Sequence, residues 1–312
     1  MYSIGSTGSK VVLIQKALKD LGYYQGNTDG IFGAVSAAAV KKFQLESNLT
    51  VTGKVDDDTW TKLFPSVPVI LSDLTRSCLA LTGSFETSTL SPECFASVTG
   101  NFDGQGMSFG ALQWNFGQGS LQPLLKDMVD NHQDVLLAIF KDKTPILKNI
   151  IGGSISSGVA FAKSIQVNCN LISPWKDMFH TLGLTKEFQD AEIRSAGVYY
   201  KNADHLAADF YISSKRGHAL MFDICVQNGS IRDDIKTLML NDIKLIDQSL
   251  SPDMIEIAKM RIIANMKADS ANPKFREDVR TRKLCIANGV GVVHGVKYDL
   301  AKQFGLDLNR AD

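Results

Sequence analysis

The sequence predicts a mainly α-helical protein with a small N-terminal domain and a larger helical domain that contains one short β-hairpin region. Apolar residues recur at three- and four-residue intervals along most of the chain. Pro65 and Pro68 interrupt this pattern, because neither can sit inside a helix. The glycine-rich stretch 100–115 interrupts it again. We therefore expect domains at 1–65 and 70–312, joined by a linker at 66–69.

The composition excludes several classes of function. A chain of 312 residues, 44% hydrophobic, is long enough for two domains. Its 33 basic and 33 acidic residues give no net charge, and no basic block points to nucleic acid. No apolar stretch is long enough to span a membrane, and no leader pattern follows Met1. We expect a monomer, made in the cytoplasm and not inserted into membranes.

The cysteines and histidines do not form a metal-binding pattern. The five cysteines lack Cys-x-x-Cys spacing, and their odd number does not fit a disulfide framework. The five histidines lack a ligand spacing such as His-Glu-x-x-His. We expect mostly buried free thiols, no metal and no cofactor. Cys94 with His132 or His180 is an alternative nucleophile, but no known local pattern accompanies it.

The N-terminal domain carries two helical patterns and a near-repeat. Apolar residues at 11–21 end at Gly22, and a second set marks 38–45. Asp29-Gly30-Ile31 leads to Ser36 as Thr52-Gly53-Lys54 leads to Thr59, with each glycine six residues before a hydroxyl. Each half is typical of a turn followed by a helix N-cap.

These residues resemble the peptidoglycan-binding family of three-helix cell-wall modules over residues 5–64. The matching positions include Val12, Gln15, Leu18, Leu21-Gly22-Tyr23-Tyr24, Asp29-Gly30-Ile31-Phe32-Gly33, Phe43-Gln44, Gly53 and Thr59-Trp60. The resemblance implies that bacterial peptidoglycan is the partner and that the module tethers an attached catalyst. Tyr23, Tyr24 and Phe32 are candidate wall contacts or, alternatively, core residues.

The second domain has the helical pattern in most of its length. An apolar stripe from Ile70 to Leu81 runs toward Glu86, and similar stripes cover 121–140, 158–166, 187–203, 205–227, 231–248, 251–268 and 274–288. Only 100–115 alternates apolar and polar residues between glycines. A mostly helical domain with one small hairpin beside a cleft is the lysozyme-like architecture.

Glu86 and Asp103 are the candidate catalytic pair. Cleavage of a glycosidic bond needs one carboxyl group that donates a proton and usually a second, ionised one across the sugar. Glu86 lies at a helix end and Asp103 in a glycine-flanked loop, which supplies two different environments. The alternatives are an ordinary exposed glutamate and an aspartate that caps its own turn.

Both segments resemble the signature of the chitosanase-type glycoside hydrolases of the lysozyme superfamily. Ser84-Phe85-Glu86 matches that family's acid, and Asp103-Gly104-Gln105-Gly106-Met107-Ser108 matches the segment with its catalytic aspartate and a water-holding hydroxyl. The resemblance implies Glu86 as general acid, Asp103 as general base, inversion at the anomeric carbon, and Ser108 as the residue that orients water. A lytic transglycosylase, which uses the acid alone, stays open.

A third segment resembles the family's charged network behind the acid. Phe222-Asp223-Ile224-Cys225-Val226-Gln227-Asn228-Gly229 is similar to the stretch that supplies its aspartate, and Arg261 and Arg282 are the closest matches for the arginines. The resemblance implies that Asp223, Arg261 and Arg282 position Glu86. Separate surface charges are the alternative.

The departures from the family favour a neutral, acetylated glycan over chitosan. Gln105 replaces an arginine, Asn228 stands where a histidine is common, and few carboxylates are available for a cationic sugar. Amides and an aromatic ring bind neutral sugars. We therefore predict substrate contacts at Gln105, Gln113, Trp114, Asn115, Gln227 and Asn228, with Trp114 alternatively in the core.

The sequence thus predicts a peptidoglycan hydrolase of the lysozyme or muramidase type. A modular phage endolysin that acts in the periplasm after release through a separate pore fits this prediction. A secreted antibacterial effector would perform the same reaction. The non-enzymatic alternative is a wall-binding structural protein of a virion.

Overall fold

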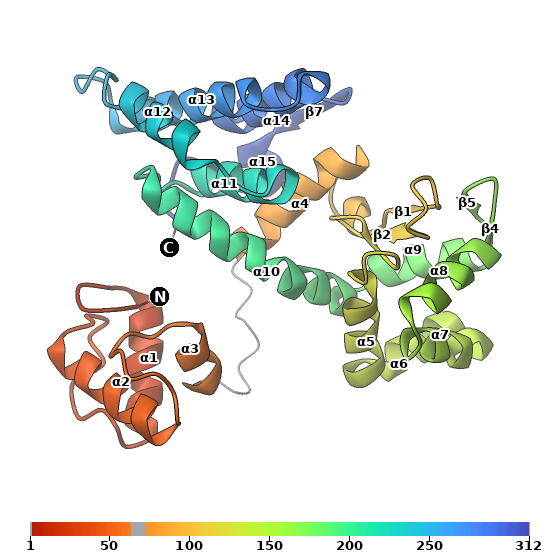
Figure 1. Ribbon diagram of the computed structural model, residues 1–312, viewed down its shortest axis with the longest axis horizontal. Helices are drawn as coiled ribbons and strands as arrows, with labels where there is room; N and C mark the ends of the chain where they lie inside the picture. The colour runs from red at the N-terminus through yellow and green to blue at the C-terminus, as the bar shows by residue number, and fades with distance from the viewer. Residues whose placement is uncertain (1, 64–72, 312) are drawn as a thin grey trace. The chain divides into compact units, whose positions relative to one another are not determined.

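The computed structural model describes residues 2–63 and 73–311, and the chain divides into two compact units, residues 1–70 and 71–311. The predicted linker at 66–69 lies outside the described residues. Helices make up most of both units and the sheets are short, so the predicted mainly helical fold is confirmed (Figure 1). None of the helices in 2–63 and 73–311 is long and apolar enough to cross a lipid bilayer.

The first unit packs three helices around its own apolar core. They are α1 (Ser9–Asp20), α2 (Ala34–Glu46) and α3 (Asp57–Leu63). Val11, Ile14 and Leu18 of α1 meet Val40 and Phe43 of α2 in this core. Two single-bridge contacts, Tyr2 with Val55 and Thr7 with Ile31, tie the connecting segments to each other.

Two buried glutamines organise the near-repeat in the first unit. The side-chain oxygen of Gln15 accepts from Gly30 N at 2.9 Å, and its amide nitrogen donates to Ile31 O at 3.0 Å and to Ser36 Oγ at 3.3 Å. Gln44 makes the matching bonds to Gly53 N at 2.8 Å, Lys54 O at 2.8 Å and Thr59 Oγ1 at 2.9 Å.

The predicted N-caps at Ser36 and Thr59 are wrong. Gly33 occupies the N-cap position of α2, and Asp56 accepts from Thr59 N at 2.9 Å ahead of α3. Both hydroxyls lie inside their helices and face the glutamines instead. The repeat in the sequence therefore reflects two equivalent glutamine-bound turns.

The second unit contains the remaining elements. Its helical segments are α4 (Asp73–Thr87), η1 (Glu93–Ala96), α5 (Leu121–Asn131), α6 (Gln133–Phe140), η2 (Lys141–Lys143), α7 (Thr144–Ile151), α8 (Ile155–Ser164), α9 (Trp175–Gly183), α10 (Lys186–Asp209), α11 (Lys215–Asn228), α12 (Asp233–Ile243), α13 (Pro252–Asp269), η3 (Pro273–Phe275), α14 (Arg276–Asn288) and α15 (Leu300–Phe304). The antiparallel sheets are β1 (Val98–Thr99), β2 (Ser108–Phe109) and β3 (Trp114–Asn115); β4 (Gln166–Val167) and β5 (Asn170–Leu171); and β6 (Val290–Val293) and β7 (Val296–Asp299).

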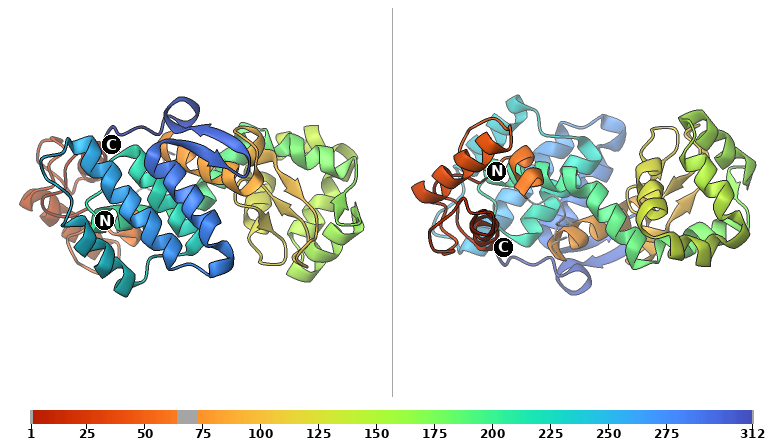
Figure 2. Two further views of the ribbon diagram at one scale, coloured as in Figure 1. Left: turned by 90° about the horizontal axis from the view of Figure 1, so that it is seen from above. Right: turned by 90° about the horizontal axis from the view of Figure 1, so that it is seen from below.

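This unit has two lobes that share the long helix α10. One lobe holds α5 to α9 with the β1–β3 and β4–β5 sheets, and the other holds α11 to α15 with the β6–β7 hairpin (Figures 1 and 2). Helix α4 packs on both α10 and α11. Phe109 of β2 stacks on Phe188 of α10 with ring centroids 4.6 Å apart, which anchors the β1–β3 sheet to this helix.

Several predicted element boundaries differ from the structure. The helix predicted over 121–140 breaks at His132, whose φ of −139° and ψ of 47° are not helical. The helices predicted at 187–203 and 205–227 run as α10 and α11, and the break falls near Tyr211, which has a φ of 53°. The prediction of one hairpin region is wrong, because the described residues contain three small sheets.

Candidate active site

Glu86 lies in the last turn of α4, where the chain leaves the helix. Apolar residues on the buried face of α4 hold the helix in the core, and Ser88, with a φ of 57°, ends it. The Glu86 side chain is 32% exposed, and its Oε1 accepts from Arg282 Nη1 at 2.8 Å. Its Oε2 has no partner among the described residues. One carboxylate oxygen is therefore anchored and the other is available to a ligand.

A buried ion group holds Arg282. Arg282 Nη2 lies 2.6 Å from Asp223 Oδ1, and Lys283 Nζ lies 2.5 Å from Asp223 Oδ2. Thr82, one turn before Glu86 on α4, donates to Asp223 Oδ1 at 3.2 Å. The three charged side chains are almost completely buried. Buried charges of this kind are stable only as pairs, because an unpaired charge in the core raises the free energy of the folded state.

The electrostatics of the group follow from burial and pairing. Burial alone would raise the pKa of Asp223, but the Arg282 and Lys283 cations outweigh it and lower this pKa to about 2. Burial lowers the pKa of Lys283 to about 8, although Asp223 opposes the shift. Asp223 is therefore ionised at neutral pH, and it fixes the guanidinium that contacts Glu86.

Lys283 stands in the network where Arg261 was expected. Arg261 Nε donates to Asn288 Oδ1 at 2.8 Å on the surface, and no contact joins Arg261 to Asp223 or Glu86 in the described part of the chain. A signal for Lys283 exists in the sequence. Arg282 and Lys283 occupy the same helical stripe as the buried Val279 and Ile286, at the spacing of core residues.

Asp103 lies on an exposed turn before β2. Its Oδ1 accepts from Gln105 N at 3.0 Å, which is the bond of an aspartate that caps its own turn. Asn101 Oδ1 accepts from Gly106 N at 2.8 Å, so the same loop is held twice. Oδ2 of Asp103 has no partner within the described ranges. This bond supports the alternative that Asp103 shapes its own turn. Its Oδ2 atom is still available for a catalytic role.

Ser108 is half-buried at the start of β2. It lies opposite Thr99 of β1 and Asn115 of β3 in the sheet register. Side chains alternate between the faces of a strand. Because Phe109 points into the core, Ser108 lies on the opposite face of this sheet.

The predicted sugar contacts divide between core and surface. Trp114 and Asn115 are only 6% and 5% exposed, so Trp114 lies in the core, as its alternative assignment had it, and neither side chain is at the surface in this conformation. Asn115 Oδ1 accepts from Gln118 N at 2.8 Å instead. Gln113 donates to Gly110 O at 2.8 Å within its own turn. Gln105, which is partly exposed, keeps an accessible side chain.

The turn that carries Gln113 rests on a buried glutamate. Glu192 of α10 is fully buried, its Oε2 lies 3.5 Å from Ala111 N, and its Oε1 has no hydrogen-bond partner among the described residues. Burial raises the pKa of Glu192 well above its usual value. A Cβ atom at Gly110 would lie 1.8 Å from Glu192 Oε1, so only glycine fits there.

Gln227 and Asn228 lie at the end of α11, next to the ion group. Both ends of the Gln227 amide are engaged, because Oε1 accepts from Lys283 at 2.7 Å and Nε2 donates to Asp278 at 3.0 Å. The Gln227 side chain therefore belongs to the hydrogen-bonded network behind Glu86, and its amide is not free for the predicted substrate contact in this conformation. Asn228 is half-buried, and its Oδ1 has no partner in the described residues.

The predicted wall contacts in the first unit are mostly core. Phe32 is fully buried and Tyr24 is nearly so, which rules both out as surface contacts in this conformation. Tyr23 is half-buried, packs edge-on against Phe43 and donates from its hydroxyl to Glu46 Oε2 at 2.8 Å. Of the three, only Tyr23 is partly exposed.

The cysteines do not form a nucleophilic site. All five are free thiols and four are buried, as predicted. Burial raises the pKa of Cys94 to about 12, which disfavours the thiolate. His180 contacts Glu93 at 2.9 Å rather than Cys94. The alternative of a Cys94 nucleophile therefore has no geometric support.

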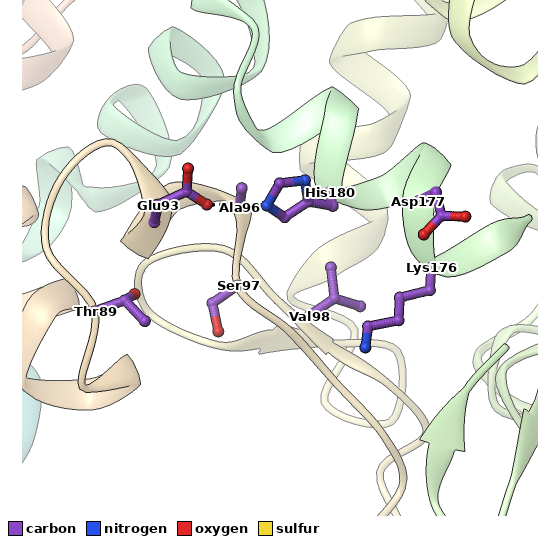
Figure 3. Close-up of a pocket in the computed structure, with 8 residues that line it drawn as sticks. All are labelled: Thr89, Glu93, Ala96, Ser97, Val98, Lys176, Asp177 and His180. Carbon is purple, nitrogen blue, oxygen red and sulfur yellow. Dashed lines mark hydrogen bonds and ion pairs between the residues drawn. The ribbon is translucent and has the colours of Figure 1, made fainter. Parts of the chain in front are cut away.

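One pocket, of about 270 Å³, opens beside β1 (Figure 3). His180, Asp177 and Lys176 of α9 line it together with Glu93 and Ser97. Thr89, three residues after Glu86, forms its rim. None of Glu86, Asp103 and Ser108 lines this pocket.

Comparison with solved structures found distant similarity to chitosanases. A chitosanase from Bacillus subtilis MY002 is 18% identical, with a TM-score of 0.43, over 76% of this chain and 92% of that one. A GH46 chitosanase from Gynuella sunshinyii in complex with chitotetraose is 13% identical, with a TM-score of 0.43 and the same coverage. A search of curated proteins found no significant match. Residues 7–63 match the family model described as "Putative peptidoglycan binding domain", so the first unit is similar to a cell-wall binding module.

Proposed function

We propose that the protein cleaves the glycan strands of bacterial peptidoglycan, with Glu86 as the general acid. One observation carries the proposal. Glu86 is an accessible carboxylate at a helix end, and a buried ion group holds one of its two oxygens. A proton donor must keep its geometry while a polymer binds against it, and supporting residues of this kind provide that.

The reaction would proceed by a single displacement. Glu86 gives its proton to the glycosidic oxygen as the bond from that oxygen to the anomeric carbon breaks. A water molecule held near Ser108 adds to the anomeric carbon from the opposite side and gives a proton to Asp103. Asp103 then releases that proton and Glu86 takes up another from solvent. The configuration at the anomeric carbon is inverted.

The first unit supports peptidoglycan as the substrate. Its match to a wall-binding family suggests that it holds the catalytic unit close to an insoluble polymer. Tethering of this kind raises the effective concentration of the enzyme at its substrate without any new contact at the active site.

A lytic transglycosylase is the second candidate. The turn bond from Gln105 N to Asp103 Oδ1 favours it, because an aspartate that shapes its own loop need not act as a base. In that mechanism Glu86 protonates the glycosidic oxygen as its bond to the anomeric carbon breaks. The 6-hydroxyl of the same muramoyl residue then attacks this carbon and gives its proton to Glu86, so no second carboxylate is needed. The product then carries a 1,6-anhydro end instead of a reducing end.

The test is digestion of purified peptidoglycan, followed by mass spectrometry of the released fragments. We expect reducing ends from the wild-type protein and at least a thousandfold slower release from Glu86→Gln. Glu187→Gln, the same change in the first turn of α10, is the matched control and should keep full activity. Anhydro ends would favour the transglycosylase. Free peptides, or equal release by Glu86→Gln, would contradict the proposal.

Two kinds of protein would use this reaction in different biological settings. A phage lysis enzyme would reach the wall through a separate pore, and a secreted antibacterial effector would reach it through a secretion machine. The neighbouring genes would separate them. A virion protein that binds the wall without cleaving it would release no fragments in the same assay.

A further inference from the structure

We infer that His294 is a positioning residue for Glu86, which it holds by capping the end of helix α4. The inference rests on the proposed role of Glu86 as the acid. His294 lies in the two-residue turn of the β6–β7 hairpin, with a φ of 50°. It is distant from Glu86 in the sequence and belongs to none of the motifs that predict the site.

The first observation is the contact with α4. His294 Nδ1 lies 3.0 Å from Phe85 O, the carbonyl one residue before Glu86. The last carbonyl groups of a helix have no partner within it, and a histidine near the C-terminus can satisfy one of them. Since a carbonyl oxygen only accepts, Nδ1 must be the donor. The imidazole therefore caps the turn that carries the acid.

The second observation is that His294 belongs to the same network as the Glu86 partner. Lys283 donates to Gln227 Oε1 at 2.7 Å, and Gln227 Nε2 donates to Asp278 Oδ2 at 3.0 Å. Asp278 Oδ1 then meets His294 Nε2 at 2.5 Å. The direction of each bond is determined, because a lysine only donates and an ionised carboxylate only accepts.

These bonds close a ring around the end of α4. In order, its members are Glu86, Arg282, Asp223, Lys283, Gln227, Asp278, His294 and the carbonyl of Phe85. Arg282 holds the carboxylate of Glu86 and His294 holds the backbone just before it. Two ends of one network thus restrain both the side chain and the main chain of the acid.

The two ring nitrogens of His294 have different neighbours. Nδ1 meets Phe85 O, a backbone acceptor, and Nε2 meets Asp278 Oδ1, a carboxylate oxygen. The charged groups around the imidazole are Asp278 of α14 and, next to the capped carbonyl, Glu86 of α4. The amide of Gln227 connects Asp278 to the more distant charges of Lys283 and Asp223.

Aromatic packing holds Phe85 in the same place. Its ring meets Tyr298 of β7 edge-on, with centroids 4.9 Å apart, and the Arg282 guanidinium lies 5.2 Å from its centroid. The hairpin therefore contacts Phe85 through both the ring and the carbonyl. A shift of the hairpin would move the residue that precedes the acid.

The experiment compares His294→Ala with His294→Asn on soluble peptidoglycan fragments. Asparagine tolerates the positive φ, and its amide can donate to Phe85 O as Nδ1 does, whereas alanine cannot. We expect His294→Ala to lower kcat at least tenfold with KM within twofold, and His294→Asn to recover most of kcat. Lys297→Ala, an exposed change on the same hairpin, is the control and should match the wild type.

Two further measurements separate positioning from loss of structure. Asp278→Asn should lower kcat in the same direction, and its effect should not multiply with that of His294→Ala, because both interrupt one chain. Imidazole ¹⁵N spectra read the contacts without activity, and we expect them to show that Nδ1 of His294 donates to Phe85 O in the wild type.

The outcomes are distinguishable. A wild-type protein that releases no fragments would refute the proposed function, and the ¹⁵N spectra would then decide whether the cap exists. An active wild type with unchanged kcat in His294→Ala, or a rise in KM alone, would overturn the role of His294 and leave Glu86 untouched. If His294→Ala does not fold, His294→Asn and Asp278→Asn are compared with the wild type instead. Unchanged kcat in Asp278→Asn would then overturn the inference that Asp278 and His294 position Glu86.

Discussion

The two oxygens of Glu86 have different surroundings. Oε1 is bonded to Arg282, and Oε2 faces no other described group, so a proton carried on Oε2 can be delivered without breaking the anchoring bond. The anchor itself rests on Asp223, which Lys283 also holds. Removal of one member of such a group leaves the others buried and unpaired, which costs more than the group contributes when intact.

The role of Asp103 can be tested by Asp103→Asn. Asparagine keeps the turn bond to Gln105 N but cannot take a proton from water. If Asp103 is the base, we expect a fall in kcat of at least a hundredfold with an unchanged melting temperature. Activity within a few-fold of the wild type, together with anhydro products, would assign Asp103 to the turn and favour the transglycosylase.

Glu192 should make stability depend on pH. Burial raises its pKa in the folded state, so the folded chain keeps the proton while the unfolded chain releases it above its ordinary pKa. The free energy of unfolding should therefore fall as pH rises above about 4.5, by up to about 1.4 kcal/mol per pH unit.

Urea unfolding of Glu192→Gln at pH 5 and pH 8 checks this. We expect the variant to lose less stability than the wild type between the two values, because glutamine does not titrate. Glu187→Gln, the same change at a half-buried position of α10, serves as the control. An equal loss in wild type and Glu192→Gln would show that the carboxyl group does not stay protonated in the folded state.

At the site, the residues that could be predicted are those with a local motif. Glu86 and Asp103 stand in short segments with a recognisable pattern, and Asp223 and Arg282 follow from a longer one. Lys283 was detectable from its helical spacing. Gln227 and His294 were not, because their roles depend on contacts between α11, α14 and the β6–β7 hairpin that no local pattern encodes.

Among the elements, long helices with one apolar face were the most predictable. Helix α13 and the helix predicted at 251–268 differ by one residue at each end. The short helices α7 and α9 lie outside the predicted segments, since eight or nine residues give too few turns for a periodic pattern. The β6–β7 hairpin has a usable signal in His294-Gly295, because two residues with positive φ suit a tight hairpin turn.

The glutamine-bound turns of the first unit support an element-scale prediction. Gln44→Met keeps the side-chain length but leaves Thr52 N and Gly53 N without their acceptor. We expect the unfolding transition of the first unit to lose at least about 2 kcal/mol. Gln15→Met should act alike, because Gly30 N loses the same acceptor. Gln25→Met at an exposed position is the control, and equal melting of all three variants would contradict the prediction.

At the scale of the whole molecule, the two units have separate cores. No residue of the first apolar cluster belongs to the second in the described chain. A variant that lacks residues 1–63 should therefore cleave soluble fragments within about twofold of the full chain. On intact walls we expect at least a tenfold loss, because tethering is removed. Equal rates on both substrates would mean that the first unit does not deliver the enzyme to the wall.

The ring around the end of α4 also has a consequence for synthesis of the chain. Arg282 follows Glu86 by 196 positions and His294 follows Phe85 by 209. A ribosome adds about 5 to 20 residues per second, so these partners emerge about 10 to 40 seconds after the acid. A nascent or prematurely terminated chain would carry Glu86 without its anchors. On the proposed function, cleavage of glycan would therefore begin only after residues 282–294 have been made, when residues 1–63 have had time to fold.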